Sequence, residues 1–169
     1  LAFDAAGNLY VAESTNATIR RIDAAGTVTT IAGAPQQHMH LDGVGTAARL
    51  TSPIGLTLAG SQLLAVTDVA SHTVRLLDLT TLALTTIAGN PGISGVADGT
   101  GLAAQFNSPY GISSYGGVLY ASDSINSTVR KVTIAGAVST LAGQPLPSGT
   151  ADGTGGAARF AGNHPIAAD

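Results

Sequence analysis

Charged side chains recur at matching places along the sequence, and the first set suggests metal chemistry. An aspartate opens each of three Asp-Gly-x-Gly segments, at Asp42, Asp98 and Asp152. Carboxylates in glycine turns can bind Ca²⁺, which prefers oxygen ligands. Each segment supplies one carboxylate, however, whereas a calcium loop carries several. The sequence therefore favours aspartates that accept backbone N–H bonds of their own turn. Calcium remains the alternative, and no other cofactor is expected.

A second set of carboxylates points to ligand binding at a rim. Glu13, Asp68 and Asp123 each follow a short apolar run and precede a polar turn. Gathered on one rim of a repeat protein, they would attract cations or basic peptides. Carboxylates in such places also close the turn that follows them, and this structural use is favoured. The rim is nevertheless the first place to look for a ligand.

A third set consists of single arginines at one position of the repeat, Arg20, Arg75 and Arg130. Rows of basic side chains bind phosphates. Here each copy adds little beyond its one arginine, and the formal net charge is −3. The sequence therefore favours salt bridges or stacking between repeats. Together with the carboxylates of the rim, the arginines complete the candidate binding set.

The histidines do not follow the repeat. They are His38, His40, His72 and His164. His38 and His40 are close enough in sequence to ligate a metal together, but the other copies have Ile-Ser and Pro-Ser in their place. Surface histidines are the better interpretation, and the sequence predicts no catalytic residue.

The charged positions recur because the whole chain repeats. Equivalent strand starts fall at Leu1, Leu56, Ile112 and Ile166, which are 55, 56 and 54 residues apart. Repeats of this length are typical of solenoids and propellers. We expect units of about 1–55, 56–111 and 112–165, with the start of a further innermost strand at 166–169.

Each unit contains four short β-prone runs, which in the middle copy span about 55–60, 62–68, 72–79 and 82–88. The runs are apolar on both faces rather than alternating, as expected for a sheet packed between two neighbours. A long connection follows, with a glycine turn and one helical turn that docks Leu50, Phe106 or Phe160 on the edge of the sheet. The sequence predicts an all-β fold of three four-stranded propeller blades.

These motifs resemble the NHL repeat, in the long-blade form found in bacteria. The resemblance lies in Gly-Asn-Leu-Tyr-Val-Ala-Glu-Ser, Ile-Arg-Arg-Ile-Asp, Thr-Thr-Ile-Ala-Gly, Asp-Gly-x-Gly-x-Ala-Ala-Arg-Leu and Ser-Pro-x-Gly, and it covers essentially the whole chain. It implies a β-propeller. Because members mostly have six blades, three copies imply half of a ring.

Composition narrows the possible partners. Only 10% of residues are charged and the net charge is negative, which argues against nucleic acid or anionic lipid. No apolar run is long enough to insert in a membrane. The residues at the start have no signal-peptide pattern. A surface rich in Thr, Ser and Ala and poor in Lys is common outside bacterial cells, so we expect a secreted or extracytoplasmic protein.

We therefore expect a non-catalytic propeller that serves as a platform for protein–protein or surface interaction. Residues 166–169 match residues 1–4, so the chain begins and ends within the same element. This favours a piece of a longer protein, with self-association through the end blades as the alternative. The rival function is a metal-dependent propeller hydrolase or lyase, whose site other blades would complete. The expected innermost strands offer no metal ligands, with Asp4 and Asp169 only at their turn ends.

Overall fold

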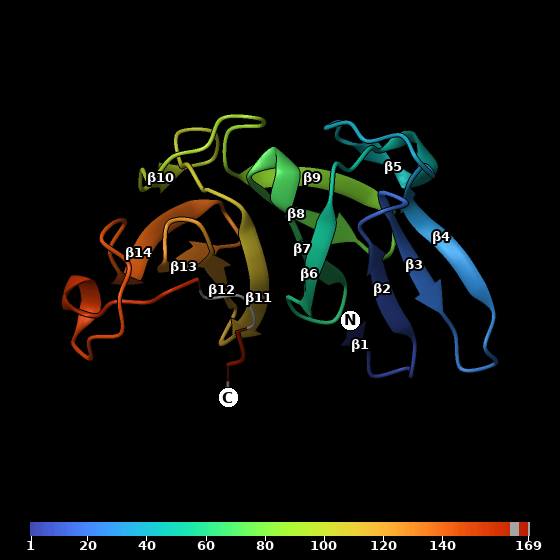
Figure 1. The fold of residues 1–169 in the computed structure, drawn as a ribbon. Coiled ribbons are helices and arrows are strands. Elements are labelled where there is room, and N and C mark those ends of the chain that lie inside the picture. Colours follow the sequence, from blue (N-terminus) through green and yellow to red (C-terminus); the bar gives the residue numbers. More distant parts are fainter. Residues whose placement is uncertain (163–165, 169) are drawn as a thin grey trace.

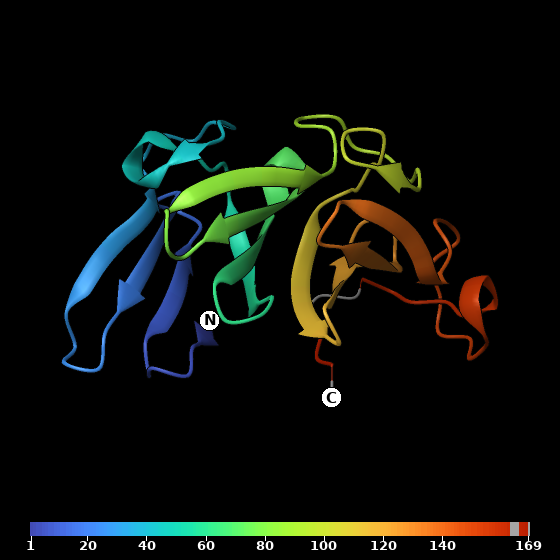
Figure 2. The ribbon, with the colours of Figure 1, turned by 180° about the vertical axis from the view of Figure 1, so that it is seen from behind.

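The computed structural model describes residues 1–162 and 166–168. Three antiparallel sheets follow one another in sequence order and stand side by side in an arc (Figure 1). The view from behind shows the same order of the three sheets (Figure 2). The all-β propeller arrangement predicted from the repeat is confirmed. No helix in the described part of the chain is long and apolar enough to cross a membrane.

The first blade has four strands in the order β1-β2-β3-β4. Each strand pairs with the next through a tight turn, which places the strands in sequence order from the innermost to the outermost. Their bounds are β1 Ala2–Phe3, β2 Leu9–Glu13, β3 Thr18–Ile22 and β4 Val28–Gly33.

The other two blades have the same meander and one strand more. The four strands of the second blade are β6 Pro53–Leu58, β7 Leu63–Asp68, β8 Thr73–Asp78 and β9 Ala83–Ala88. Those of the third are β11 Pro109–Tyr115, β12 Val118–Asp123, β13 Thr128–Thr133 and β14 Ala137–Gly143. The runs predicted for the middle copy agree with these bounds to within two residues.

The fifth strand of each of these two sheets comes from the preceding connection. β5 (Gly43–Val44) pairs antiparallel with β9, and β10 (Gly99–Thr100) pairs with β14. The sequence analysis expected four strands per blade, and these two short strands were missed. Each connection thus covers the outer edge of the next blade, where a bare row of N–H and C=O groups would otherwise lie.

Three-residue 3₁₀ helices take the place of the helical turn expected in the first and third connections. These are η1 Gly45–Ala47 and η3 Gly155–Ala157. A further one, η2 Val69–Ser71, lies between β7 and β8. The side chains of Leu50 and Phe106 are fully buried, as expected. Phe160 is only partly buried.

A glycine with positive φ recurs at the end of the fourth strand of each blade. Gly33, Gly89 and Gly143 have φ values of +85°, +96° and +88°. A Cβ on Gly89 would lie 2.3 Å from the carbonyl oxygen of His72, and the other two glycines are similarly close to a carbonyl. Two residues before each glycine the register of the strands shifts by one residue, as in a β-bulge. Glycine is therefore required by both φ and space.

The hydrophobic core lies between the blades. One cluster joins the first blade to the second, with Ile19 and Ile31 packed against Leu64, Val66 and Leu84. A second joins the second blade to the third, through Val74, Phe106 and Leu119 among others. A blade with a neighbour on each side therefore buries both of its faces, which explains why its strands are not amphipathic.

Candidate functional site

The charged set of the second blade forms an ion-pair cluster beneath the connection. Arg75 is fully buried and lies 3.4 Å from Asp68, which is fully buried as well. Its other guanidinium nitrogen lies 2.8 Å from Asp42 of the preceding connection. It also donates to the backbone carbonyls of Leu41 and Arg49. One arginine thus joins a blade to the connection that precedes it.

The third blade repeats the arrangement. Arg130 lies 2.8 Å from both Asp123 and Asp98, and donates to the carbonyls of Ala97 and Gln105. Its guanidinium also stands 5.1 Å from the ring centre of Phe106, within the range of a cation–π contact. Arg75 and Arg130 therefore both make salt bridges, and Arg130 also stacks on an aromatic ring.

In the first blade the equivalent pair is open. Arg20 lies 3.3 Å from Glu13, and their side chains are 32% and 30% exposed. Glu13 also accepts a hydrogen bond from Thr18. This hydrogen bond is the largest contribution that lowers the pKa of Glu13. No connection covers this pair in the part of the chain that the structure describes.

The aspartates of the first two glycine turns accept hydrogen bonds from the next blade. Asp42 accepts hydrogen bonds from the backbone N–H and the hydroxyl of Thr86, and Asp98 does the same with Thr140. The expectation that they bind their own turn is therefore wrong for these two. Asp152 is exposed and has no hydrogen-bond or ion-pair partner within residues 1–162 and 166–168.

Burial and hydrogen bonding shift these carboxyl groups in opposite directions. Partial burial works to raise the pKa of Asp42 and of Asp98, but the threonine and arginine donors outweigh it and lower both. For Asp123 burial dominates and raises the pKa, although the Asn107 N–H, Asn126 and Arg130 oppose it. The oxygens of these carboxyl groups already accept hydrogen bonds from neighbouring donors, so the groups hold the connections and blades together.

Residues 1–162 and 166–168 contain no group of three or more His, Asp or Glu side chains that could hold an ion. His38 bonds the Thr51 carbonyl, whereas His40 bonds the Thr86 hydroxyl. His72 accepts a hydrogen bond from the Ser108 N–H. His164 and Asp169 lie outside the described residues.

The six rim candidates thus do not form one exposed charged surface. Asp68, Asp123, Arg75 and Arg130 are buried, and only Glu13 and Arg20 are partly exposed. Asp68 accepts hydrogen bonds from the backbone of Thr51 and Ser52, which fixes the connection above it. The rim to which these residues belong is covered by the connections, and any ligand there meets the loops first.

Those loops present apolar side chains. Six large hydrophobic residues of the first two connections are 48–61% exposed: Met39, Leu41, Val44, Ile93, Val96 and Leu102. Both connections lie along the upper edge of the molecule in Figure 1, beside β5 and β10. We call this surface the loop rim. A cavity of about 420 Å³, lined by Leu41, Pro91, Leu102 and Thr86 with His40 and Asp42, opens in it.

Sequence reasoning missed the loop rim because its residues do not align between copies. Met39 and Ile93 fall in the variable part of their connections, and only their exposure marks them. The usable signal was the presence of large apolar residues in segments rich in Gly and Pro, where loops normally carry polar ones.

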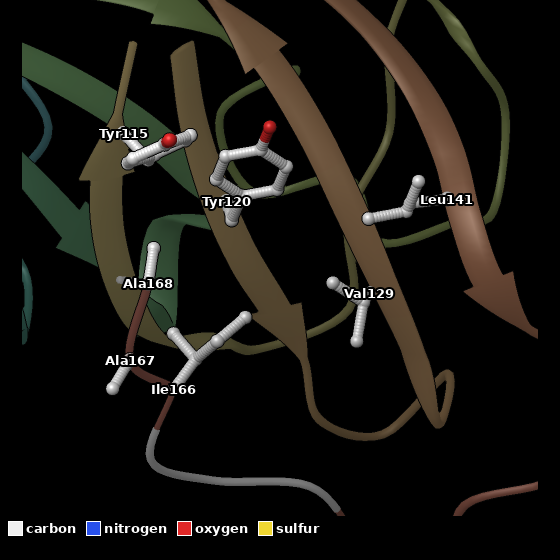
Figure 3. A pocket seen from close by; sticks show the side chains of 7 residues that line it. All are labelled: Tyr115, Tyr120, Val129, Leu141, Ile166, Ala167 and Ala168. Atoms are coloured by element: carbon white, nitrogen blue, oxygen red, sulfur yellow. The ribbon is translucent and has the colours of Figure 1, made fainter.

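A second apolar surface lies on the open face of the third blade. Tyr115, Tyr120, Val129 and Leu141 line a pocket of about 310 Å³ together with residues 166–168 (Figure 3). The backbone N–H of Ala168 donates to the Ser113 hydroxyl, so this last segment lies against the innermost strand β11. The segment expected to start another inner strand is close to that place, although its described residues form no strand.

Comparison by sequence finds relatives with the same repeat. The chain is 33% identical over 132 residues to bovine "NHL repeat-containing protein 2", a match that covers 72% of this chain. It spans only 18% of the length of that relative. The human protein of the same name is 32% identical over the same length. No family model matches the chain.

Comparison by structure finds β-propellers. An auxiliary nutrient binding protein from Bacteroides thetaiotaomicron superposes with a TM-score of 0.74 at 19% identity, covering 98% of this chain and 41% of that one. Virginiamycin B lyase from Staphylococcus aureus superposes with a TM-score of 0.58 at 13% identity, covering 82% of this chain and 39% of the lyase. At these identities the likeness concerns the fold alone.

Proposed function

Because this chain belongs to the NHL-repeat β-propellers, we propose that it is a non-catalytic platform that binds a protein partner through its loop rim. The observation that carries the proposal is the exposure of six large hydrophobic side chains on two neighbouring connections. Apolar side chains gathered on loops over a rigid scaffold are typical of interaction sites. A partner with a small apolar anchor, seated in the cavity beside Leu41 and Leu102, fits this surface.

The charge distribution supports a protein partner over a small charged ligand. The carboxylates and guanidinium groups of the second and third blades already hold one another beneath the rim. Burying apolar area is then the main source of binding energy, at about 25 cal/mol per Å² removed from water. We infer a place outside the cytoplasm for this platform, from its low content of Lys and Glu.

A peptide display selection against the purified chain tests the proposal. We expect selected peptides to carry Leu, Phe or Trp anchors and to lose at least about tenfold in affinity for the Leu41→Ser/Leu102→Ser double variant. Ser61→Arg, in an exposed turn of the middle blade, is the control and keeps full affinity. Peptides that bind both variants equally would contradict the assignment to the loop rim.

The same preparation tests the catalytic alternative. The strands β1, β6 and β11, which lie innermost, contain no His, Asp or Glu. We therefore expect less than one metal ion per several chains after dialysis, measured by plasma mass spectrometry. One tightly held Ca²⁺ or Zn²⁺ per chain, together with turnover of an ester or lactone, would favour an enzyme instead.

A further inference from the structure

A cavity of about 350 Å³ lies between the first blade and the second, and we call it the interblade cavity. Its polar lining comes from both blades: Asp4, Asn8, Tyr10 and Arg21 of the first, and Ser61 and Gln62 of the second. Most of these residues belong to the turns between β1 and β2 and between β6 and β7. These turns lie at the lower side of the molecule in Figure 1, whereas the loop rim lies along the upper edge. The volume falls within the range of about 300–1,000 Å³ that is usual for small-molecule sites.

Arg21 brings unused hydrogen-bond donors to this cavity. It is partly buried, and within residues 1–162 and 166–168 no hydrogen bond or ion pair reaches its guanidinium group. Its Nε atom is shielded from water as well. Arg20, Arg75 and Arg130 also leave Nε unpaired, but each holds a carboxylate through its terminal nitrogens. Arg21 differs because its terminal nitrogens are unused too, so its positive charge can pair with an anion from outside the chain.

The fold does not require a charged residue at this position. Tyr10 and Arg21 pair across β2 and β3, and the equivalent pair in the second blade is Ala65 and Leu76. Ala65 and Leu76 belong to the core that the second blade shares with the third. Strand alternation places Arg21 on the same face of β3 as the buried Ile19, which packs toward the second blade. The junction of the first two blades therefore has a polar cavity in a place where apolar side chains fill the next junction.

The carboxylate of Asp4 limits the charge that a ligand can carry. Its Oδ1 accepts the backbone N–H bonds of Ala6 and Asn8, and its Oδ2 accepts bonds from the Asn8 amide and the Tyr10 hydroxyl. The hydrogen bond from the Asn8 side chain is the largest contribution that lowers the pKa of Asp4 to about 2, so the group is ionised at neutral pH. These four donors occupy the sites that a carboxylate offers. Among the residues that line the cavity, a ligand thus meets one unpaired positive charge and one negative charge that is already bonded, which favours a single negative charge on the ligand over two.

We propose that the interblade cavity binds a small carboxylate that carries hydroxyl groups, such as a sugar acid, with its carboxylate on Arg21. The planar guanidinium matches a carboxylate through two parallel hydrogen bonds, which are stronger than neutral ones. Gln62 accepts a hydrogen bond from the Thr80 hydroxyl at its carbonyl oxygen. Its amide N–H groups are then left to bind a ligand hydroxyl, beside the hydroxyl of Ser61. Leu79 adds an apolar wall for the carbon skeleton. This site goes beyond the proposed partner binding and lies apart from the loop rim.

Isothermal titration calorimetry with D-glucuronate as the probe tests the proposal. We expect the wild type to bind it with a dissociation constant of about 1 mM or lower. D-Glucose has the same ring without the carboxylate, and it should bind at least about tenfold more weakly because the charged pair with Arg21 is missing. D-Glucose 6-phosphate carries a second negative charge, and it should also bind more weakly than D-glucuronate, because Asp4 repels it more strongly.

Three variants locate the binding. Arg21→Met should bind D-glucuronate at least about tenfold more weakly, with unchanged circular dichroism, because Arg21 holds no carboxylate in the described chain. Arg20→Met is the matched control. It removes the same charge one residue away, on the opposite face of β3, and keeps full affinity. Gln62→Glu changes an exposed position. It keeps an oxygen for the Thr80 hydroxyl but brings a negative charge to the cavity, and it should weaken binding of D-glucuronate at least about fivefold.

Three results would overturn the proposal. The first is an absence of binding for D-glucuronate, D-gluconate and L-lactate alike up to about 50 mM, far above the dissociation constant expected. The second is equal affinity of the Arg21→Met and Arg20→Met variants for D-glucuronate, which would remove Arg21 from the site. The third is tighter binding of D-glucose or D-glucose 6-phosphate, which would assign the cavity to another class of ligand. Peptide binding at the loop rim is measured on a separate surface, so these results leave the proposed function to its own test.

Discussion

Arg75 illustrates how one residue of the repeat is used twice, once within its blade and once across a junction. It is fully buried with Asp68 and also holds Asp42 of the preceding connection. A buried ion pair adds little stability over well-packed apolar residues, but removing one partner leaves a buried charge uncompensated. Arg20 pairs only with Glu13 of its own blade, and both side chains of this pair are partly exposed.

This difference predicts unequal effects of the same substitution. Arg75→Met is expected to lower the free energy of unfolding by about 3–5 kcal/mol, because the buried Asp68 then loses its guanidinium partner. Arg20→Met, the matched control, is expected to cost about 0–1 kcal/mol, as for other solvent-exposed pairs. Urea denaturation of both variants measures the values. Equal effects would show that the connection adds nothing to the role of the buried arginine.

His72 predicts a pH dependence of stability. Burial lowers its pKa below 6.5, so the unfolded chain takes up a proton before the folded one as the pH falls. The free energy of unfolding therefore decreases as the pH falls from 6.5 toward the lower folded pKa.

His72→Asn should flatten this slope between about pH 7 and 5, measured by urea denaturation at each pH. The asparagine tolerates the left-handed backbone (φ 60°) and offers an oxygen to the Ser108 N–H. His40, whose pKa is lowered by burial and then by Arg75, keeps a slope of the same sign. A slope unchanged in the variant would assign the effect to other groups.

At the scale of the strand, a register shift recurs beside each arginine and two residues before each recurring glycine. The register shift near Gly89 lies between Val74 and Arg75, and that near Gly143 lies between Val129 and Arg130. The arginine and its apolar neighbour point to opposite faces of the blade, so they serve different junctions.

Gly89→Ala is expected to destabilise the protein by more than about 3 kcal/mol, because its Cβ would lie 2.3 Å from the His72 carbonyl oxygen. Gly7→Ala is the control for backbone strain alone. It has a similar φ of +84° and nothing within 4 Å of the added atom, so a cost of about 1 kcal/mol is expected. Thermal unfolding distinguishes them. Equal costs would mean that space around Gly89 is not limiting.

The strands could be predicted from the sequence because the β-prone runs recur three times at matching positions of the repeat. β5 and β10 could not, because two-residue strands such as Gly43–Val44 carry no periodicity of their own and exist only through the edge they cover. The partners of Asp42 could not be predicted either, because they are distant in sequence. A turn aspartate normally bonds locally, whereas here the donors belong to Thr86, 44 residues away, and to Arg75.

Across the whole molecule, burial is greatest in the middle blade. Its core side chains are fully buried, among them Leu64, Val74 and Leu84, whereas Val28 of the first blade and Leu141 of the third are 47% and 49% exposed. In repeat proteins each unit is stabilised by its neighbours, so a blade with two neighbours should open less often than a blade with one.

Amide hydrogen exchange should show this gradient. We expect the slowest exchange in β7 and β8, and exchange at least about tenfold faster in β4 and β14. Uniform protection in all three blades would mean that the chain unfolds only as one cooperative unit.

The strands that seal the outer edges are made before the edges themselves. β5 precedes β9 in the chain, with three other strands between them, and β10 precedes β14 in the same way. During synthesis, we therefore expect the second and third blades to pair their last strand with a short strand that has already been made. This order of the elements should shorten the time for which the outer sheet edges of these two blades are unpaired, when such edges can pair with other chains.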